Sequence, residues 1–227
     1  GDYNTIYVID TESMTRNADI SLTPGLPHAI ALSSDGTTLY AANLTKDRIS
    51  ILNTVTGEYI EDIVLSPGSV SVHEPMHMYI SPDDKYLYVN CRKSSKMLVI
   101  DTQTKSIITE LLIHEHPMYS AISADGNRIY IVSHHHPYIT EVTKSGDSWT
   151  ITNEFQSPEF HHLYGADLSP DGRYLYVTCS NSEDDFQARY QQHGQTRAAL
   201  LCVYDTQTHE IVRILDVGSY ATGIVSR

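Results

Sequence analysis

The sequence predicts an all-β chain built from four-stranded antiparallel sheets, and three observations point to this fold class. Apolar and polar residues alternate over short runs, and no run shows the 3.6-residue period of a helix. Turn residues, above all Asp and Gly, separate these runs. The whole pattern then repeats along the chain at intervals of 42 to 48 residues.

The repeat is clearest in four segments that each place a Ser, an Asp turn and an apolar–Tyr pair after an alternating run. The turn aspartates are Asp35, Asp83, Asp125 and Asp171, at spacings of 48, 42 and 46 residues. Three of them precede Gly, which supplies the positive φ of a tight hairpin turn. We therefore interpret these aspartates as turn formers and not as catalytic residues.

A second element follows each turn: a strand that ends in Asp or Asn followed by Thr, as in "LVIDTQTKS" and "LCVYDTQTHE", and then another alternating run. Each repeat thus contains strand A, a tight turn, strand B, a variable loop, strand C, a polar turn and strand D. Short strands in groups of four at this period are typical of the blades of a β-propeller. We expect a single propeller domain over residues 1–227, with blades at about 26–65, 74–113, 116–155 and 162–215.

The strand B motifs "YVNC" at 88–91 and "YVTC" at 176–179 resemble the YVTN-type β-propeller repeat family, as does "SPDGRYLYVT" followed by "VYDTQTHEIV". The resemblance covers essentially the whole chain. It implies the propeller fold but leaves the function open, because such propellers serve as surface adhesion modules, sugar lactonases and redox-protein domains. Tryptophan–aspartate repeats are excluded, since the single tryptophan, Trp149, is not followed by Asp.

The residues on either side of the four blades are expected to belong to further blades. Residues 3–22 fit strands C and D of a preceding blade, and residues 220–227 fit strand A of a following blade. In a five-bladed ring closed by both ends, one blade would lack strand B and leave hydrogen-bonding edges open. We favour a section of a larger ring, for which the resemblance implies about seven blades.

Composition narrows the classes of partner. With 15 Lys and Arg against 28 Asp and Glu, the formal net charge is −13, so the chain lacks the electrostatic attraction that nucleic-acid binding needs. We expect no nucleic-acid partner, no transmembrane segment, and no disulfide framework from three cysteines. Sixteen tyrosines against three phenylalanines favour an exported β-protein, which predicts a periplasmic, extracellular or cell-surface location.

The histidines gather in particular connections of the predicted blades. In an antiparallel four-stranded sheet, the D-to-A and B-to-C connections lie at one end of the strands. The A-to-B and C-to-D turns lie at the other end. Eleven of the twelve histidines fall in or beside the first set, and only His209 falls in a C-to-D turn. The eleven are His28, His73, His77, His114, His116, His161 and His162 near D-to-A connections, and His134, His135, His136 and His193 in B-to-C connections.

Loops on a rigid scaffold are where propellers place function. We therefore predict a binding scaffold that holds a partner protein or a small ligand through a histidine-rich face at the mouth of the central channel. The candidate contact residues on this face are His28, His73, His77, Arg92, Tyr190 and His193.

A first alternative is a metal- or haem-associated redox propeller, because imidazole is a common ligand of copper, iron and zinc. It would be similar to nitrous oxide reductase or to the haem d1 propellers, although the chain carries no convincing copy of either ligand motif. Consecutive residues of an extended loop point to different sides, so at most two rings of "SHHHP" should reach one ion. The metal candidates are His116, His134, His135, His136, His161 and His162.

A second alternative is a sugar lactonase-like hydrolase. The segment "LPHAIALSSDGTTLYAANLTKDRI" is similar to the Pro-His start of strand A in seven-bladed sugar lactonases. The resemblance implies that His28, His77 and Arg92 would hold a sugar acid and activate water. A serine hydrolase is not expected, since the chain has no GxSxG elbow. The catalytic residues, and whether the protein is an enzyme at all, stay open at this stage.

Overall fold

The structure is a computed structural model that describes residues 4–22, 24–180, 198–218 and 221–226. Regular structure in these residues consists of β-strands joined by turns. A search of the same residues for a long apolar helix that could cross a membrane finds none. The chain divides into two compact units, Gly1–Glu110 and Leu111–Arg227. Whether residues 1–227 act as one domain stays a prediction.

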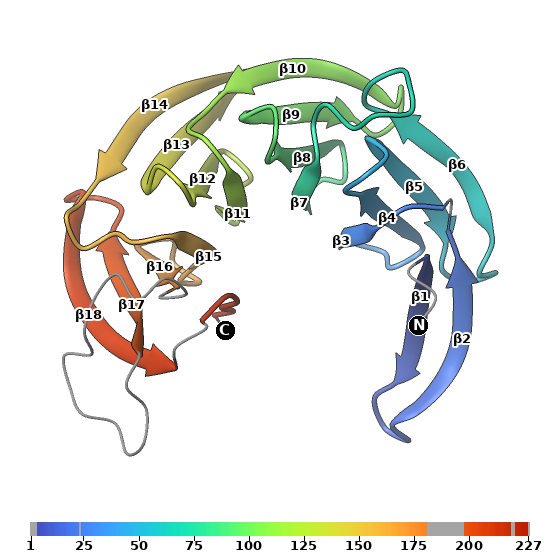
Figure 1. Cartoon of the computed structure of the whole chain (residues 1–227), viewed down its shortest axis with the longest axis horizontal. Helices are drawn as coiled ribbons and strands as arrows, with labels where there is room; N and C mark the ends of the chain where they lie inside the picture. The colour runs from blue at the N-terminus through green and yellow to red at the C-terminus, as the bar shows by residue number, and fades with distance from the viewer. Residues whose placement is uncertain (1–3, 23, 181–197, 219–220, 227) are drawn as a thin grey trace. The chain divides into compact units, whose positions relative to one another are not determined.

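The first unit consists of a two-stranded hairpin followed by two four-stranded antiparallel sheets, in which strands pair in chain order (Figure 1). The hairpin occupies the segment that was expected to form strands C and D of a partial blade. Its strands are β1 (Thr5–Asp10) and β2 (Thr15–Ser21), followed by β3 (Pro27–Leu32), β4 (Thr38–Asn43), β5 (Arg48–Asn53), β6 (Tyr59–Val64), β7 (Pro75–Ile80), β8 (Tyr86–Cys91), β9 (Lys96–Asp101) and β10 (Ser106–Leu112).

The second unit repeats this organisation in two more antiparallel sheets. The four-stranded blades predicted from the repeat are therefore confirmed. The strands are β11 (Pro117–Ile122), β12 (Arg128–Ser133), β13 (Tyr138–Ser145), β14 (Ser148–Gln156), β15 (Leu163–Leu168), β16 (Tyr174–Cys179), β17 (Ala198–Asp205) and β18 (Glu210–Gly218).

The strand expected at residues 220–227 is not formed in the part that the structure describes. Residues 221–226 have no strand pairing, and the backbone amide and hydroxyl of Ser226 instead donate hydrogen bonds to the Asp167 carboxylate and the Leu168 carbonyl.

The serine and aspartate of the repeat build each A-to-B turn. In the first sheet the Ser33 hydroxyl donates to the Asp35 carboxylate at 2.7 Å and accepts from the Thr38 amide at 2.9 Å. Hydrogen bonds from serine hydroxyls and backbone amides hold the pKa of these carboxyls below the usual value for Asp. The predicted role as turn formers is therefore correct, and the same contacts recur at Ser81–Asp83, Ser123–Asp125 and Ser169–Asp171.

The threonine after strand C joins the two turns of a blade. The Thr54 hydroxyl donates to the Gly36 carbonyl at 2.5 Å, so the start of the C-to-D turn is held against the A-to-B turn. Thr102 and Thr206 make the equivalent contacts with the carbonyls of Asp84 and Gly172. The two turns are therefore held together by a threonine hydroxyl in three of the four blades.

A set of backbone hydrogen bonds joins the connections at the opposite end of the strands in each sheet. The residue after strand B donates its amide to the carbonyl of the residue just before strand A, as His134 does to His116 at 2.9 Å. This contact, which we call the loop pin, ties the B-to-C connection to the D-to-A connection. The other loop pins are Leu44 to Leu26, Arg92 to Glu74 and Ser180 to His162.

Each unit has its own apolar core. Every residue of β8 is buried, and Leu87, Val89, Leu98 and Ile100 pack in the core of the first unit. The D strands are much less covered: β10 alternates between exposed and partly buried residues. The second unit has an equivalent core around β12, β16 and β17. Covered inner strands and half-exposed outer strands agree with the alternating pattern of the sequence.

Asp47 organises the long connection between β6 and β7. This carboxylate is almost fully buried and accepts hydrogen bonds from the Ser66 hydroxyl at 2.7 Å and from the amides of Val72, His73 and Glu74 at 2.6 to 3.0 Å; the Ser71 hydroxyl also donates to it. Burial alone would raise its pKa, but these donors outweigh burial and lower the pKa of Asp47 below the usual value.

Replacing Asp47 with Ala should destabilise the protein by about 3 kcal/mol, because five donors would lose a charged acceptor. Chemical denaturation of the Asp47→Ala variant measures this loss. Glu12→Ala is the matched control, since it removes an equal charge from an exposed position in the β1–β2 turn. Equal stability of the two variants would show that Asp47 does not hold the connection.

Candidate histidine-lined binding site

The structure places ten of the eleven predicted histidines in or beside the connections that carry the loop pins. His28 and His77 lie in β3 and β7, and His73 lies in the β6–β7 connection. The other seven belong to the second unit. His114 and His116 precede β11, His134 to His136 follow β12, and His161 and His162 precede β15. Tyr190 and His193 lie outside the described residues.

Four histidines of the second unit touch one another, and we call them the histidine cluster: His116, His134, His135 and His162. The rings of His116 and His135 stack with centroids 3.7 Å apart and planes inclined by 22°. His134 lies 5.3 Å from His135 and 4.5 Å from His162, again between ring centroids. The Nδ1 atoms of His134 and His162 are 3.4 Å apart.

The loop pins explain why these rings meet. His116 and His162 hold equivalent places before strand A, where both adopt a positive φ, 54° and 39°. Histidine occurs in this left-handed region more often than most residues with a Cβ atom. The His116 carbonyl accepts the amide of His134, so the pin brings a D-to-A histidine beside the first residue of "HHHP".

The remaining histidines of the second unit have other neighbours. His136 Nδ1 lies 3.2 Å from a carboxylate oxygen of Glu115, at an exposed position. The His114 ring stacks on Tyr138 with centroids 3.7 Å apart, and its Nε2 lies 2.9 Å from Glu154. The three consecutive histidines of "SHHHP" therefore point to different neighbours, as expected for an extended loop.

In the first unit the predicted face residues form separate contacts. His28 Nδ1 lies 2.7 Å from the Met76 carbonyl, and His73 Nδ1 lies 3.0 Å from the Ser94 hydroxyl. Arg92 donates from both Nε and a terminal nitrogen to one carboxylate oxygen of Glu74, at 3.1 and 2.8 Å. This guanidinium is therefore already paired with a carboxylate and is not free to hold an anionic substrate.

His77 lies in β7 and is partly buried. Burial, with a smaller contribution from the charge on His28, lowers the pKa of His77 to about 3. The ring packs edge-on against Tyr79 with centroids 4.8 Å apart. An imidazole that stays neutral down to this pH is a weak proton acceptor near neutrality, so His77 is poorly suited to general-base catalysis.

Metal-binding capacity is limited among the side chains that the structure describes. They include no group of three or more His, Cys, Asp or Glu residues arranged to hold one ion. Among the six metal candidates, His134 and His162 have their Nδ1 atoms 3.4 Å apart. The six-residue metal site stays a prediction.

The cysteines are buried in the sheets. Burial raises the pKa of the Cys91 thiol, so this side chain behaves as a small apolar residue. Cys179 Sγ lies 3.8 Å from Cys202 Sγ across β16 and β17, and the hydrogen bond between the two thiols lowers the pKa of Cys179. No disulfide is formed among these three cysteines.

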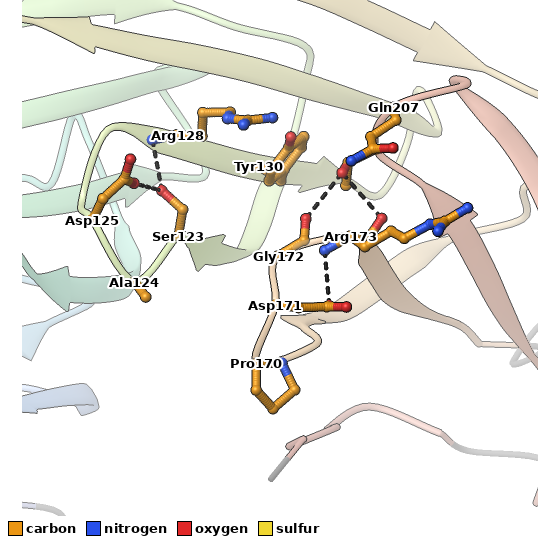
Figure 2. A pocket seen from close by; sticks show the side chains of 11 residues that line it. Ser123, Ala124, Asp125, Arg128, Tyr130, Pro170, Asp171, Gly172, Arg173 and Gln207 are labelled. Carbon is orange, nitrogen blue, oxygen red and sulfur yellow. Dashed lines mark hydrogen bonds between the residues drawn. The ribbon is translucent and has the colours of Figure 1, made fainter.

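A pocket lies in the second unit, at the end of the strands that carries the hairpin turns (Figure 2). The sequence did not predict it. It has a volume of about 250 Å³ and lies between the A-to-B turn of the β11–β14 sheet and that of the β15–β18 sheet. Ala124, Arg128, Tyr130, Gly172 and Arg173 line it, together with the turn aspartates. One difference between the repeats could have indicated the pocket: "SPDD" at 81–84 ends in Asp84, whereas "SPDG" at 169–172 ends in Gly172.

Four-stranded antiparallel sheets repeated along the chain, each with the same turns and loop pins, define the blades of a β-propeller. The comparison with protein families agrees with this class. The family described as "Lactonase, 7-bladed beta-propeller" matches residues 5–111, which is less than half of the 227 residues. The chain is thus a β-propeller chain that is similar to this family over its first unit. The YVTN-type repeat itself stays a prediction.

Relatives with known names support the same class. Antigen Lp49 from Leptospira interrogans is 27% identical over 171 residues, which is 68% of this chain and 36% of that protein. The chain therefore spans little more than a third of this curated relative. Kuenenia stuttgartiensis hydrazine synthase superposes with a TM-score of 0.77 at 19% identity, over 95% of this chain and 60% of that one.

A second solved structure, the Cps50 (Swd1) β-propeller domain of Myceliophteria thermophila, has a TM-score of 0.60 at 11% identity. It covers 98% of this chain and 83% of that one. At such identities the likeness to both solved structures shows the fold alone.

The low pKa of His77 predicts how stability depends on pH. In the unfolded chain this side chain takes up a proton near its ordinary pKa of 6.5, whereas in the folded protein it does so only near 3. Stability should therefore fall as the pH drops from 6.5 towards 3, with a contribution from His77 of up to about 1.4 kcal/mol per pH unit.

The His77→Gln variant should lose this contribution and show a flatter stability curve between pH 6.5 and 4, measured by denaturant unfolding. His209→Gln is the control, because His209 is exposed on the β17–β18 turn. It should retain the slope of the parent protein. A parent-like slope in His77→Gln would contradict the assignment.

Proposed function

We propose that this chain is a binding platform whose histidine cluster captures a transition-metal ion, and through that ion a ligand or a partner protein. The observation that carries the proposal is the 3.4 Å separation of the Nδ1 atoms of His134 and His162. Zn–N distances are about 2.0 to 2.1 Å, so two nitrogen ligands at a tetrahedral angle stand about 3.4 Å apart. The two rings therefore have the spacing of ligands that share one ion.

The chemistry of the cluster suits this role. In the absence of an ion, one of the two rings donates its Nδ1–H to the Nδ1 of the other. To bind an ion, both Nδ1 atoms would have to offer a lone pair, so both rings would carry their hydrogen on Nε2. Binding should weaken at acidic pH, because protons compete for the same nitrogens. His116 and His135 stack beside this pair and limit the movement of the loop that carries His134.

Two protein ligands leave further coordination positions open on the ion. Water, a small ligand or a side chain of a partner can fill them, which makes the site suited to capture and less suited to permanent structural use. An exported location, periplasmic or at the cell surface, accords with the tyrosine-rich composition and with the name of the Leptospira relative, which is called an antigen.

Titration of tag-free protein with Zn²⁺ and with Cu²⁺, followed by calorimetry, tests the metal proposal. We expect saturable binding of one ion per chain that weakens as the pH falls, and its loss in both His134→Ala and His162→Ala. Elemental analysis and a visible absorption spectrum of the purified protein record whether a metal or haem is retained.

His136→Ala is the matched control, since it removes a neighbouring imidazole that faces Glu115 and not the pair. Its affinity should stay within twofold of the parent, because the ion pair of His136 is with Glu115 and not with a ring of the pair. Absence of saturable binding, or equal loss in His136→Ala, would reject the metal site.

A second candidate function, sugar lactone hydrolysis, is favoured by the family match over residues 5–111. His28, His77 and Arg92 all lie within this range. The Arg92–Glu74 contacts and the low pKa of His77 weaken the roles first assigned to these two residues, which leaves His28 as the remaining polar candidate. Under this reading the chain accelerates hydrolysis of glucono-δ-lactone and His28→Ala removes the acceleration.

The lactone assay follows acid release at constant pH, with buffer alone as the blank. A rate equal to that of the blank would reject the hydrolase candidate without affecting the metal proposal. His209→Ala controls for the loss of an imidazole elsewhere on the chain, and it should leave any hydrolysis unchanged.

A further inference from the structure

The A-to-B turns of the first unit are joined by a carboxylate. Asp84, in the turn between β7 and β8, reaches the turn between β3 and β4 of the neighbouring sheet. Its two oxygens lie 2.9 and 3.1 Å from the Ser34 amide, and one accepts the Ser34 hydroxyl at 2.5 Å. The first unit therefore contains a small carboxylate-binding site that its own side chain fills.

The equivalent place in the second unit lacks this side chain. Counting from the turn serine of each repeat, Gly172 corresponds to Asp84, and Ala124 corresponds to Ser34. Gly172 and Asp84 share the same left-handed backbone conformation, with φ of 69° and 59°. The pocket of about 250 Å³ opens at this place (Figure 2).

The backbone donor that Asp84 satisfies in the first unit has a counterpart in the pocket. Ala124 lines it, and among the residues that the structure describes none accepts a hydrogen bond from the Ala124 amide. The pocket thus offers a backbone N–H at the position where the first unit binds a carboxylate.

The charges lining the two sites differ in the direction that favours an anion. Arg128 stands where the first unit has Thr38, and Arg173 stands where it has Lys85. The pocket has therefore lost one negative charge, that of Asp84, and gained one positive charge relative to the filled site. Arg173 also contacts Asp205 at 3.3 Å, and Arg128 interacts with the Tyr130 side chain and, more weakly, with the charges of Glu141 and Asp125.

We propose that the pocket between the turns of the second unit binds a carboxylate group supplied from outside the chain, held by the Ala124 amide and the Arg128 guanidinium. Asp84 shows the pose that the bound group would take. The pocket and the histidine cluster lie at opposite ends of the strands. This site is therefore independent of the proposed metal capture.

The volume limits what can bind. A pocket of about 250 Å³ lies just below the usual range for drug-sized ligands, so it suits a small organic acid or a single acidic side chain. Both sources present the same carboxylate chemistry. Guanidinium and backbone N–H donors recognise an ionised carboxylate through charge-assisted hydrogen bonds in either case.

The experiment is a titration followed by amide chemical shifts in two-dimensional NMR of the full chain. The probes are sodium acetate and the blocked peptide acetyl-Gly-Glu-Gly-amide, each compared with sodium chloride at equal ionic strength. We expect a saturable shift of the Ala124 amide with a carboxylate probe and none with chloride. Tighter binding of acetate assigns a free acid as the ligand, and tighter binding of the peptide assigns an acidic side chain.

Two complementary variants test the pose. Gly172→Asp should fill the pocket in the manner of Asp84 and abolish the response of Ala124; a Cβ added to Gly172 meets no atom within 4 Å. Asp84→Gly should empty the site in the first unit and make the Ser34 amide respond to acetate. Glycine suits the left-handed backbone at this position.

Arg128→Gln provides a test that leaves the turn itself intact, and it should weaken binding about tenfold through loss of one charge-assisted contact. The proposal is overturned if acetate and peptide shift the Ala124 amide no more than chloride does. It is equally overturned if a folded Gly172→Asp variant binds as the parent does.

Discussion

One backbone hydrogen bond per blade, the loop pin, decides where the functional side chains lie. It joins the residue after strand B to the residue before strand A, at 2.8 to 3.1 Å in the four blades. Because these two positions are far apart in sequence but fixed in space, any residue type placed there becomes a neighbour of the other. In the second unit both positions of one pin are histidines, His116 and His134, and the cluster follows from that coincidence.

The two units carry different side chains at equivalent positions of their blades. In the first unit, side chains of the chain itself occupy the sites that the scaffold creates: Asp84 joins two turns, Asp47 holds a long connection, and Glu74 neutralises Arg92. In the second unit the equivalent positions are Gly172 at the turn and histidines at the connections. In the first unit these positions are therefore occupied by carboxylates of the chain itself.

Burial separates the histidines by chemistry. His77 is enclosed in β7 and held neutral, which suits packing and costs stability in acid. The rings of the histidine cluster contact one another. The negative net charge of −13 attracts cations to the chain as a whole, whereas the turn pocket is lined by two arginines and two aspartates.

The sequence by itself determined the blades, because alternating apolar residues and Ser-Asp turns at a fixed period leave few other folds for these strands. It also located the histidines in the right connections and the aspartates in the turns. Only the tertiary structure decided which rings meet, that Arg92 is paired, that residues 221–226 form no strand, and that a pocket opens beside Gly172. These facts depend on contacts between residues 18 to 59 positions apart, which a one-dimensional pattern does not encode.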